Sequence, residues 1–431
     1  MFFYFSFLRT PPQSGSQSSS VVFTPQVTND LRTEPYPSSI DIFYWWISYT
    51  PQNVTRLSEP AKLTTWRQEN AYKPLQIPPP SKKLIGAAAE IDCSLVLTPA
   101  PSVTSSVIDL RDPEIGRVPL PVCSLPIRIS VSPQQQQRRD VANTTTTKSP
   151  KQEAITRSFR LFDDDGDAIP LMQIQETISF DLDKKLWDSG IGLSAWLVHL
   201  SSVKNVSAVE SSIPSEQQPA VVPELKERLF GSKECHIIEL GAGTGIVSLA
   251  LAALRSVTSS TSQGFHDESC ILSTDLPSSM ELMSYNIRTN AALYPNCAPT
   301  SLPLDWDEEL PETVQNVRER GGFDLVVMAD VTYNTSSFPA LLQTLASLLA
   351  LSAAHHVADD ADDGPRSQEQ ERDDRGHNNP LVLLAYKERD PAERQLWDMM
   401  ARETGVVLEC VGKQAGAGGL PVEIWLGKRR I

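Results

Sequence analysis

A glycine-rich turn between an apolar run and a helical pattern is the clearest chemical feature of this sequence. Residues 236–240 are mostly apolar, Gly241-Ala242-Gly243-Thr244-Gly245 follows, and residues 245–254 have the composition of a helix. Glycine accepts positive φ and lets a ligand approach the bare backbone. The amides and the dipole at the start of the next helix point to the same place. The pattern therefore predicts a strand, a tight turn and a helix that together hold a cofactor.

The spacing of these glycines narrows the type of cofactor. A dinucleotide site has the pattern G-x-G-x-x-G, but the third glycine position is occupied here by Ile246. No Lys-Ser or Lys-Thr pair follows, which excludes the phosphate loop of a nucleotide hydrolase. A tight turn in an unrelated α/β protein remains an alternative at this point.

Two acidic residues are predicted at the ends of apolar strands. Asp275 ends the run 271–275, and Asp330 ends the run 323–330. Open α/β sheets bind ligands at the carboxyl ends of their strands, and an acid at the end of the second strand can accept hydrogen bonds from both ribose hydroxyls of a nucleoside. Trp306 ends a shorter strand-like stretch, 302–306, and could stack on an adenine ring.

Composition limits the class of protein. The chain has 431 residues, enough for more than one domain, and its net charge of -15 argues against general nucleic-acid binding. Its six cysteines form no C-x-x-C pair, which is typical of thiols in a reducing compartment. No apolar run reaches the roughly 20 residues of a membrane span. The apolar start 1–8 lacks the basic residues of a signal sequence, so we expect a loosely docked or disordered end.

The chain divides by composition near residue 150. We expect residues 1–150 to be a mostly disordered Pro/Ser/Gln/Thr-rich extension with short ordered segments, and residues 151–431 to be one α/β domain. The apolar run 40–47 is expected as a strand or helix covering the main domain, or else as a partner-docking segment. Polar insertions are expected near 256–269 and 353–379.

Neither acidic nor histidine-rich segments predict a metal site. Residues 163–167 alternate acids as a calcium loop does, but Gln173 stands where an EF-hand needs Glu, so a hairpin turn is expected. His355, His356 and His377 form no convincing ligand set.

From about Phe159 onward, five separated segments together resemble the family 16 lysine methyltransferases, a group of seven-β-strand enzymes, and within it the branch that methylates the valosin-containing protein chaperone or Hsp70. The last segment fits the D-x-x-Y pattern of that family. The resemblance implies an α/β fold with a Rossmann-like seven-stranded sheet and helices on both faces, plus S-adenosyl-L-methionine as cofactor. The five segments are 186–189, 239–245, 274–276, 305–306 and 329–333.

The resemblance also implies residue roles. Asp330 would lie beside the incoming amine and Tyr333 would shape the channel, so these two are the expected catalytic residues. Gly241 and Gly243 would face the methionine moiety, and Asp275 would hold the ribose. The remaining cofactor-binding residues implied by the motifs are Trp187, Glu239, Ala242, Trp306 and Ala329.

The leading hypothesis is a protein-lysine N-methyltransferase acting on a chaperone or translation factor. A lysine must lose its proton before it accepts a methyl group, and its free pKa is about 10.4. A carboxylate at Asp330 opposes that loss, so its expected role is to orient the amine. A small-molecule N-methyltransferase and an inactive cofactor-binding scaffold remain alternatives. We expect a cytoplasmic, possibly also nuclear, monomer with a protein substrate, without nucleic-acid or membrane partners.

Overall fold

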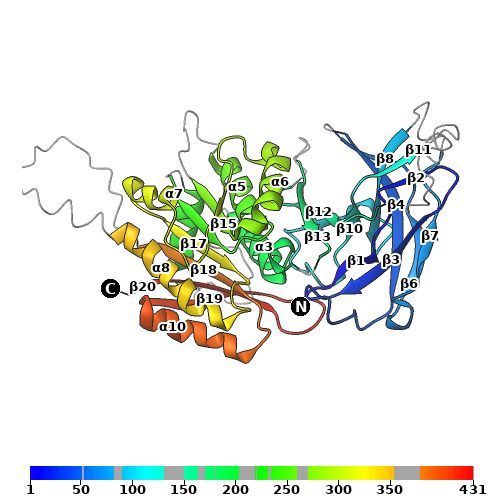
Figure 1. Ribbon diagram of the computed structural model, residues 1–431. Helices are drawn as coiled ribbons and strands as arrows, with labels where there is room; N and C mark the ends of the chain where they lie inside the picture. Colours follow the sequence, from blue (N-terminus) through cyan, green and yellow to red (C-terminus); the bar gives the residue numbers. More distant parts are fainter. Residues whose placement is uncertain are drawn as a thin grey trace, which may run out of the picture. The chain divides into compact units, whose positions relative to one another are not determined.

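The computed structural model describes residues 1–50, 53–81, 90–130, 150–163, 170–179, 181–202, 219, 221–231, 234–259, 270–353 and 379–430 (Figure 1). The chain forms two compact units. The N-terminal unit contains Met1–Asp163, Leu171–Lys185 and Ala415–Gly419, and the C-terminal unit contains Asp164–Pro170, Leu186–Gln414 and Leu420–Ile431. Among the described residues, no helix has the length and apolarity needed to cross a membrane.

The C-terminal unit is built on a seven-stranded sheet. Its order is β16-β15-β14-β17-β18-β20-β19, with β20 antiparallel to both neighbours and the other pairs parallel. The strands are β14 (Ile237–Leu240), β15 (Ile271–Asp275), β16 (Thr300–Pro303), β17 (Leu325–Ala329), β18 (Leu381–Tyr386), β19 (Val406–Gln414) and β20 (Val422–Arg429). The predicted seven-stranded α/β fold is confirmed.

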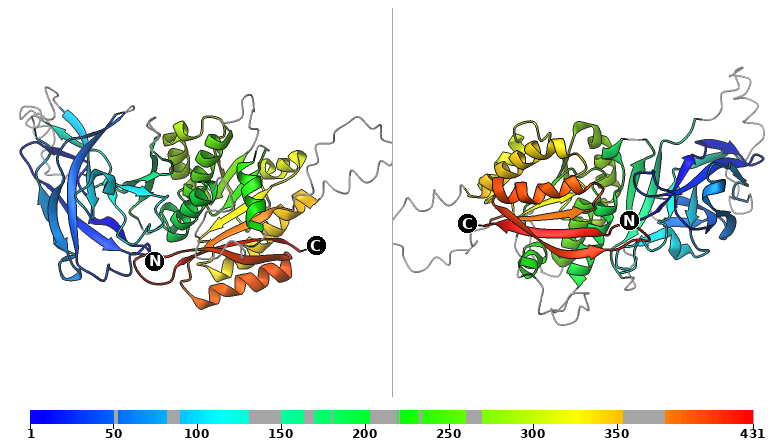
Figure 2. Two further views of the ribbon diagram at one scale, coloured as in Figure 1. Left: turned by 180° about the vertical axis from the view of Figure 1, so that it is seen from behind. Right: turned by 90° about the horizontal axis from the view of Figure 1, so that it is seen from below.

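Helices cover both faces of this sheet (Figure 2). Ile238, Val326 and Leu384, at alternating strand positions, share one apolar core with residues of α7, α8 and α10. On the other face α3 packs against α5, and Gly192 of α3 lies against Val422 of β20. The helices are α3 (Asp188–Ser202), α4 (Val221–Phe230), α5 (Ile246–Ser259), α6 (Met280–Thr289), α7 (Glu312–Gln315), α8 (Phe338–Ala353) and α10 (Gln395–Glu403).

Strand register aligns the predicted site residues. Leu240 of β14 pairs with Thr274 on one side and with Met328 on the other. The residues that follow these three, namely Gly241, Asp275 and Ala329, therefore stand level at the carboxyl edge of the sheet. Continuous apolar sequence is what strands buried on both faces require, and β14, β17 and β18 are buried almost throughout.

The N-terminal unit is a β structure made of two sheets. One has three strands in the order β1-β3-β7; the other has ten, following β13-β12-β10-β8-β11-β2 with β4, β5, β6 and β9 attached. The strands are β1 (Tyr4–Arg9), β2 (Ser14–Ser16), β3 (Val21–Thr28), β4 (Ile40–Thr50), β5 (Asn53–Arg56), β6 (Ala61–Trp66), β7 (Leu75–Ile77), β8 (Glu90–Thr98), β9 (Val107–Asp109), β10 (Val122–Ser124), β11 (Ile127–Ser130), β12 (Ala154–Arg160) and β13 (Met172–Thr177).

Large aromatic side chains fill the core of the N-terminal unit. Phe7 of β1 and Phe23 of β3 meet edge to face, with ring centroids 5.7 Å apart, and the same core includes Trp46 and Trp66 from the larger sheet. A buried ion pair joins Arg157 of β12 to Glu176 of β13, with Nε and Oε1 2.7 Å apart. The Arg157 side chain also donates hydrogen bonds to three backbone carbonyls, so this buried charge is well satisfied.

The expectation of a mostly disordered extension over residues 1–150 is wrong for its described residues. Pro, Ser and Thr are abundant there, but short strands bury aromatic side chains between the polar stretches. The run 1–8 overlaps β1, which begins at Tyr4, and the run 40–47 lies in β4, which pairs with β5, β6 and β8 inside this unit.

The predicted boundary near residue 150 is also wrong. β12 and β13 follow it in sequence, yet both belong to the N-terminal unit because β12 pairs with β10. The described residues do not include the predicted polar link 134–147, residues 260–269 and 354–378 of the predicted insertions, or residues 164–167 of the predicted turn. His355, His356 and His377 also lie outside the described residues.

Candidate functional site

The predicted glycine turn joins β14 to α5, and it needs glycine for both conformation and space. Gly241, Gly243 and Gly245 have φ values of 68°, 55° and 81°. Residues other than glycine rarely adopt these φ values because their Cβ atom comes too close to the following carbonyl oxygen. A Cβ on Gly241 would also lie 3.0 Å from Val331 Cγ1 and 3.5 Å from Trp306 Cζ2. The turn therefore presents bare backbone at the edge of the sheet.

Asp275 faces this turn from the neighbouring strand. Its Oδ2 accepts a hydrogen bond from Gly243 N at 2.7 Å, and its Oδ1 accepts one from Leu276 N at 2.7 Å. Ala242 N donates to Thr274 O at 2.9 Å, which fastens the turn to the end of β15. The carboxylate and the glycine backbone thus form one local arrangement, as the sequence predicts.

Glu239 lies beneath the turn, with 1% of its surface exposed. Its Oε2 accepts hydrogen bonds from Ser248 N at 3.0 Å and from Ser248 Oγ, in the first turn of α5. Burial raises the pKa of the Glu239 carboxyl to about 7, and the Asp275 charge adds to the shift. The structure gives this carboxyl a supporting position under the turn, where it fastens strand to helix.

The other predicted pocket residues lie around the same edge. Trp306 has its ring next to Gly241 and packs on the core under α8, while its carbonyl accepts a hydrogen bond from Thr344 Oγ1 at 3.3 Å. Ala329, the last residue of β17, is partly exposed. Ala242 is 7% exposed within the turn.

Asp330 is held in an unusual conformation directly after β17. Its φ is 60°, one of two positive values at described non-glycine residues, and Asp tolerates this region better than most residues. Its backbone N donates to Ala385 O at 3.1 Å, which ties it to β18. The side chain is 4% exposed. The turn therefore aims a buried carboxylate at the carboxyl edge of the sheet.

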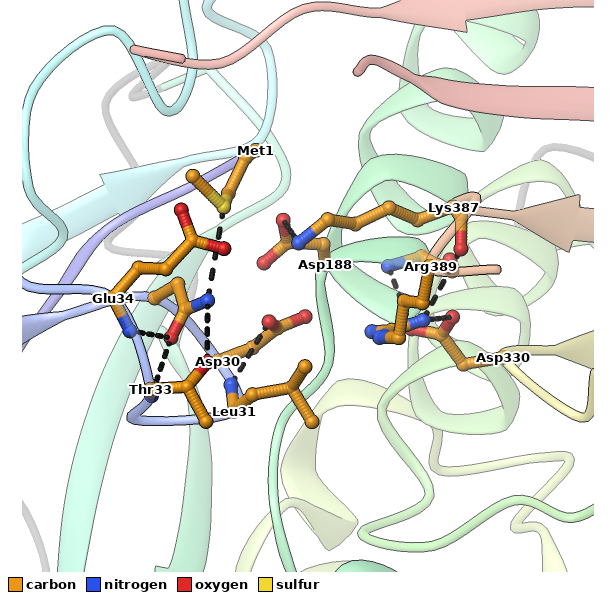
Figure 3. A network of polar contacts seen from close by, with 11 residues as sticks. Met1, Asp30, Leu31, Thr33, Glu34, Asp188, Asp330, Lys387 and Arg389 are labelled. Atoms are coloured by element: carbon orange, nitrogen blue, oxygen red, sulfur yellow. Dashed lines mark hydrogen bonds and ion pairs between the residues drawn. The ribbon is translucent and has the colours of Figure 1, made fainter. Parts of the chain in front are cut away.

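The Asp330 carboxylate forms an ion pair that the sequence analysis did not predict (Figure 3). Arg389 Nη1 lies 2.5 Å from Oδ1, and Arg389 Nη2 lies 3.2 Å from Oδ2. Ser189 N, at the start of α3, donates to Oδ2 at 3.3 Å. Arg389 also lies over the ring of Trp187, with its Cζ 5.1 Å from the ring centroid.

A second ion pair lies next to the first. Lys387 Nζ is 2.7 Å from Asp188 Oδ2, and the two side chains are 6% and 0% exposed. Lys387 and Arg389 belong to the charged run 387–390, which directly follows β18, the next strand along the sheet from β17. The rule that parallel strands end at one ligand-binding edge, applied to this run, could have drawn attention to them.

Tyr333 differs from Asp330 in its burial. Its side chain is 57% exposed, whereas Thr332 before it is buried and donates to Glu393 Oε2 at 3.4 Å. In the D-x-x-Y segment, Asp330 is thus buried at the carboxyl edge of the sheet and Tyr333 lies at the surface. An exposed aromatic ring three residues after a buried carboxylate suits contact with a long side chain that enters from outside.

Comparison with known proteins agrees with this geometry. Residues 167–361 match the family model described as lysine methyltransferase. This segment is therefore similar to the lysine methyltransferase family over somewhat less than half of the chain. The resemblance stated from the five motifs is therefore confirmed for this segment, which carries the glycine turn, Asp275, Asp330 and Tyr333.

Several curated relatives of this family are similar to the chain. Protein-lysine N-methyltransferase EFM6 of Saccharomyces cerevisiae is 27% identical over 187 residues, covering 42% of this chain and 62% of the relative. Protein N-lysine methyltransferase METTL21A of Danio rerio is 33% identical over 112 residues, covering 26% and 43%. EEF1A lysine methyltransferase 3 of Xenopus tropicalis is 30% identical over 120 residues, covering 28% and 44%. The matches therefore span roughly half of each relative.

Proposed function

We propose that this protein is an S-adenosyl-L-methionine-dependent protein-lysine N-methyltransferase. The observation that carries the proposal is the Asp330 carboxylate, buried directly after β17, on the sheet edge where Gly241 and Asp275 stand level with Ala329. A cofactor site and a group able to orient an amine thus share one edge. The family of residues 167–361 and the names of the relatives support the same activity.

The residues at the turn suit this cofactor. Gly241 leaves open a space that a Cβ would fill, and Asp275 lies where it can accept hydrogen bonds from ribose hydroxyls. Trp306, beside Gly241, is placed to stack on the adenine ring. When bound, S-adenosyl-L-methionine supplies a sulfonium methyl group, whose C–S bond breaks as the N–C bond to the amine forms and whose bonding electrons stay on sulfur.

The protein's role is to align the substrate amine with the methyl group and to shield the amine from water. A displacement of this kind needs no acid for the leaving group, so alignment of the amine can supply much of the rate. We assign to Asp330 the role of accepting a hydrogen bond from an N–H of the substrate amine. This hydrogen bond orients the nitrogen lone pair toward the methyl carbon. Tyr333 is assigned to the channel wall. The proton that the lysine loses passes to water.

The substrate is proposed to be a protein of the chaperone or translation-factor class. Relatives include EEF1A lysine methyltransferase 3, and the motifs resemble the branch that acts on the valosin-containing protein or Hsp70. Purified eEF1A, valosin-containing protein and Hsp70 are accordingly the first acceptors to test. We further propose a monomer that acts in the cytoplasm.

Transfer of labelled methyl from S-adenosyl-L-methionine into a total cell lysate tests the proposal. We expect label in a protein band with the wild type and none with Asp275→Ala, because the variant cannot hold the ribose. Glu281→Gln, a change at an exposed acid of α6, should leave the labelling intact. Label confined to small molecules would favour a metabolite N-methyltransferase, and cofactor binding without any label would favour an inactive scaffold.

A further inference from the structure

Arg389 has the geometry of a residue that sets the position of another. Its two terminal nitrogens contact the two oxygens of Asp330, as a planar guanidinium fork does with a carboxylate. Both side chains are largely buried, 13% and 4% exposed. A buried pair of this kind fixes the carboxylate far better than a surface pair would.

Arg389 also connects three segments of the edge. It pairs with Asp330 after β17, lies over the Trp187 ring before α3, and follows β18 in sequence. Lys387 makes a parallel connection from β18 to Asp188 at the start of α3. Arg389 therefore ties the carboxylate that follows β17 to the segment that begins α3.

We propose that Arg389 is a positioning residue for methyl transfer: its guanidinium holds the Asp330 carboxylate in place and cancels its charge where a substrate lysine must be neutral. This inference rests on the proposed function and deepens it. Nothing in the amine-orienting role of Asp330 requires a net negative charge, since a neutral amine can donate an N–H to a paired carboxylate.

The hydrogen-bond count at Asp330 supports this role. A carboxylate offers roughly four acceptor positions on its two oxygens. Among the described residues, Arg389 Nη1 uses one on Oδ1, while Arg389 Nη2 and Ser189 N use both on Oδ2. One position on Oδ1 is left for an amine N–H, so the pair also selects the direction from which the amine binds.

Among the charged groups near the Arg389–Asp330 ion pair, Arg389 is the one that most affects whether the substrate lysine is protonated. An isolated carboxylate stabilises an ammonium, whereas a nearby guanidinium destabilises it. Asp188 faces the pair from α3 but is matched by Lys387 from the end of β18. Glu393 is nearby, and burial raises the pKa of its carboxyl. Loss of Arg389 would leave Asp330 uncompensated, and the substrate lysine would keep its proton to higher pH.

Four variants of the full chain separate the charge of Arg389 from its geometry. Arg389→Gln removes the charge and the guanidinium fork, whereas Arg389→Lys keeps the charge but loses the fork. Asp330→Asn removes the carboxylate alone, and Asp330→Asn/Arg389→Gln removes both partners. Arg402→Gln is the control, since Arg402 pairs with Glu403 at the surface of α10. The measurements are the labelling rate of the lysate band as a function of pH, and the affinity for S-adenosylhomocysteine by calorimetry.

We expect Arg389→Gln to lower the rate at pH 7.5 and to move the midpoint of the pH–rate profile up by about 1 unit. Arg389→Lys should lower the rate by about tenfold and leave the midpoint in place. The double variant should match Asp330→Asn within about threefold, because Arg389 acts through Asp330. Affinity for S-adenosylhomocysteine should change by less than about threefold in all of them.

The proposal is overturned if folded Arg389→Gln keeps the wild-type rate and midpoint, or if its effect is the same with and without Asp330. If Arg389→Gln does not fold, Arg389→Lys decides: a wild-type rate overturns the proposal, and a lower rate with an unmoved midpoint supports it. Absence of labelling by the wild type would instead overturn the proposed function, and this inference with it.

Discussion

At the scale of single residues, the backbone of Gly241 is both a structural and a binding requirement. Gly241→Ala places a side chain at φ 68° and against Val331. We expect a stability loss of about 1–2 kcal/mol and an affinity for S-adenosylhomocysteine at least about tenfold lower. Denaturant unfolding and calorimetry measure the two effects.

Gly321→Ala is the matched control for that prediction. Gly321 has φ 95°, but a Cβ there meets nothing within 4 Å and lies outside the site. It should lose similar stability and keep full affinity. Equal losses of affinity in both variants would show that the effect at Gly241 is one of general instability.

Glu239 makes the stability of the fold depend on pH. Its folded pKa of about 7 exceeds its ordinary value of 4.5, so the folded state binds the proton more tightly. The free energy of unfolding should therefore fall as pH rises from about 4.5 to about 7, by up to ~3 kcal/mol. Glu239→Gln, which is always neutral, should remove this part of the pH dependence while its amide oxygen still accepts from Ser248.

Urea unfolding at pH 5 and pH 8 tests this expectation. The wild type should lose more stability between the two values than Glu239→Gln does, and the exposed Glu281→Gln should behave as the wild type. Equal losses in the wild type and Glu239→Gln would mean that the carboxyl is not the group responsible.

At the scale of elements, β1 shows how a segment of low apparent order is fixed by packing. Phe7 is 1% exposed inside the aromatic core, whereas its neighbour Leu8 is 41% exposed. Phe7→Ala should cost about 3–5 kcal/mol and Leu8→Ala no more than about 0.5 kcal/mol. Denaturant unfolding, with proteolysis of the N-terminal unit as the probe, measures the loss of unfolding free energy in each variant. Similar losses in Phe7→Ala and Leu8→Ala would contradict the buried position of β1.

The elements that the sequence predicted best are the buried parallel strands. β15 has the predicted limits, and the predicted ends of β14 and β17 are within two residues of those observed, because each strand is a mostly apolar run that ends at a glycine or an acidic residue. The strands of the N-terminal unit were mostly missed. They alternate with proline-rich and polar segments, and their stability comes from aromatic contacts between segments far apart in sequence.

Arg389 marks the limit of prediction at the site. Gly241, Gly243, Asp275 and Asp330 could be found because motif and strand ends are local features. The pairing of Arg389 with Asp330 depends on the register of β18 against β17 and on the positive φ of Asp330, which only the fold determines. The buried role of Glu239 likewise depends on where α5 begins.

At the scale of the whole molecule, the net charge of -15 should assist encounter with basic substrates. Salt shortens the Debye length from about 30 Å at 0.01 M to about 8 Å at 0.15 M. We therefore expect kcat/KM for a basic protein acceptor to fall over this range while kcat changes little. Steady-state kinetics with added NaCl measures this, and a kcat/KM independent of salt would exclude a contribution from long-range attraction.

Under the proposed function, the protein places a methyl group on a lysine side chain of a protein substrate. Tandem mass spectrometry of the labelled acceptor, after reaction with the wild type and with Asp330→Asn, tests it most directly. We expect methylation at a lysine ε-amine with the wild type and a strongly reduced yield at the same lysine with the variant. Methylation of arginine, histidine or a chain terminus, or an equal yield from both proteins, would contradict it.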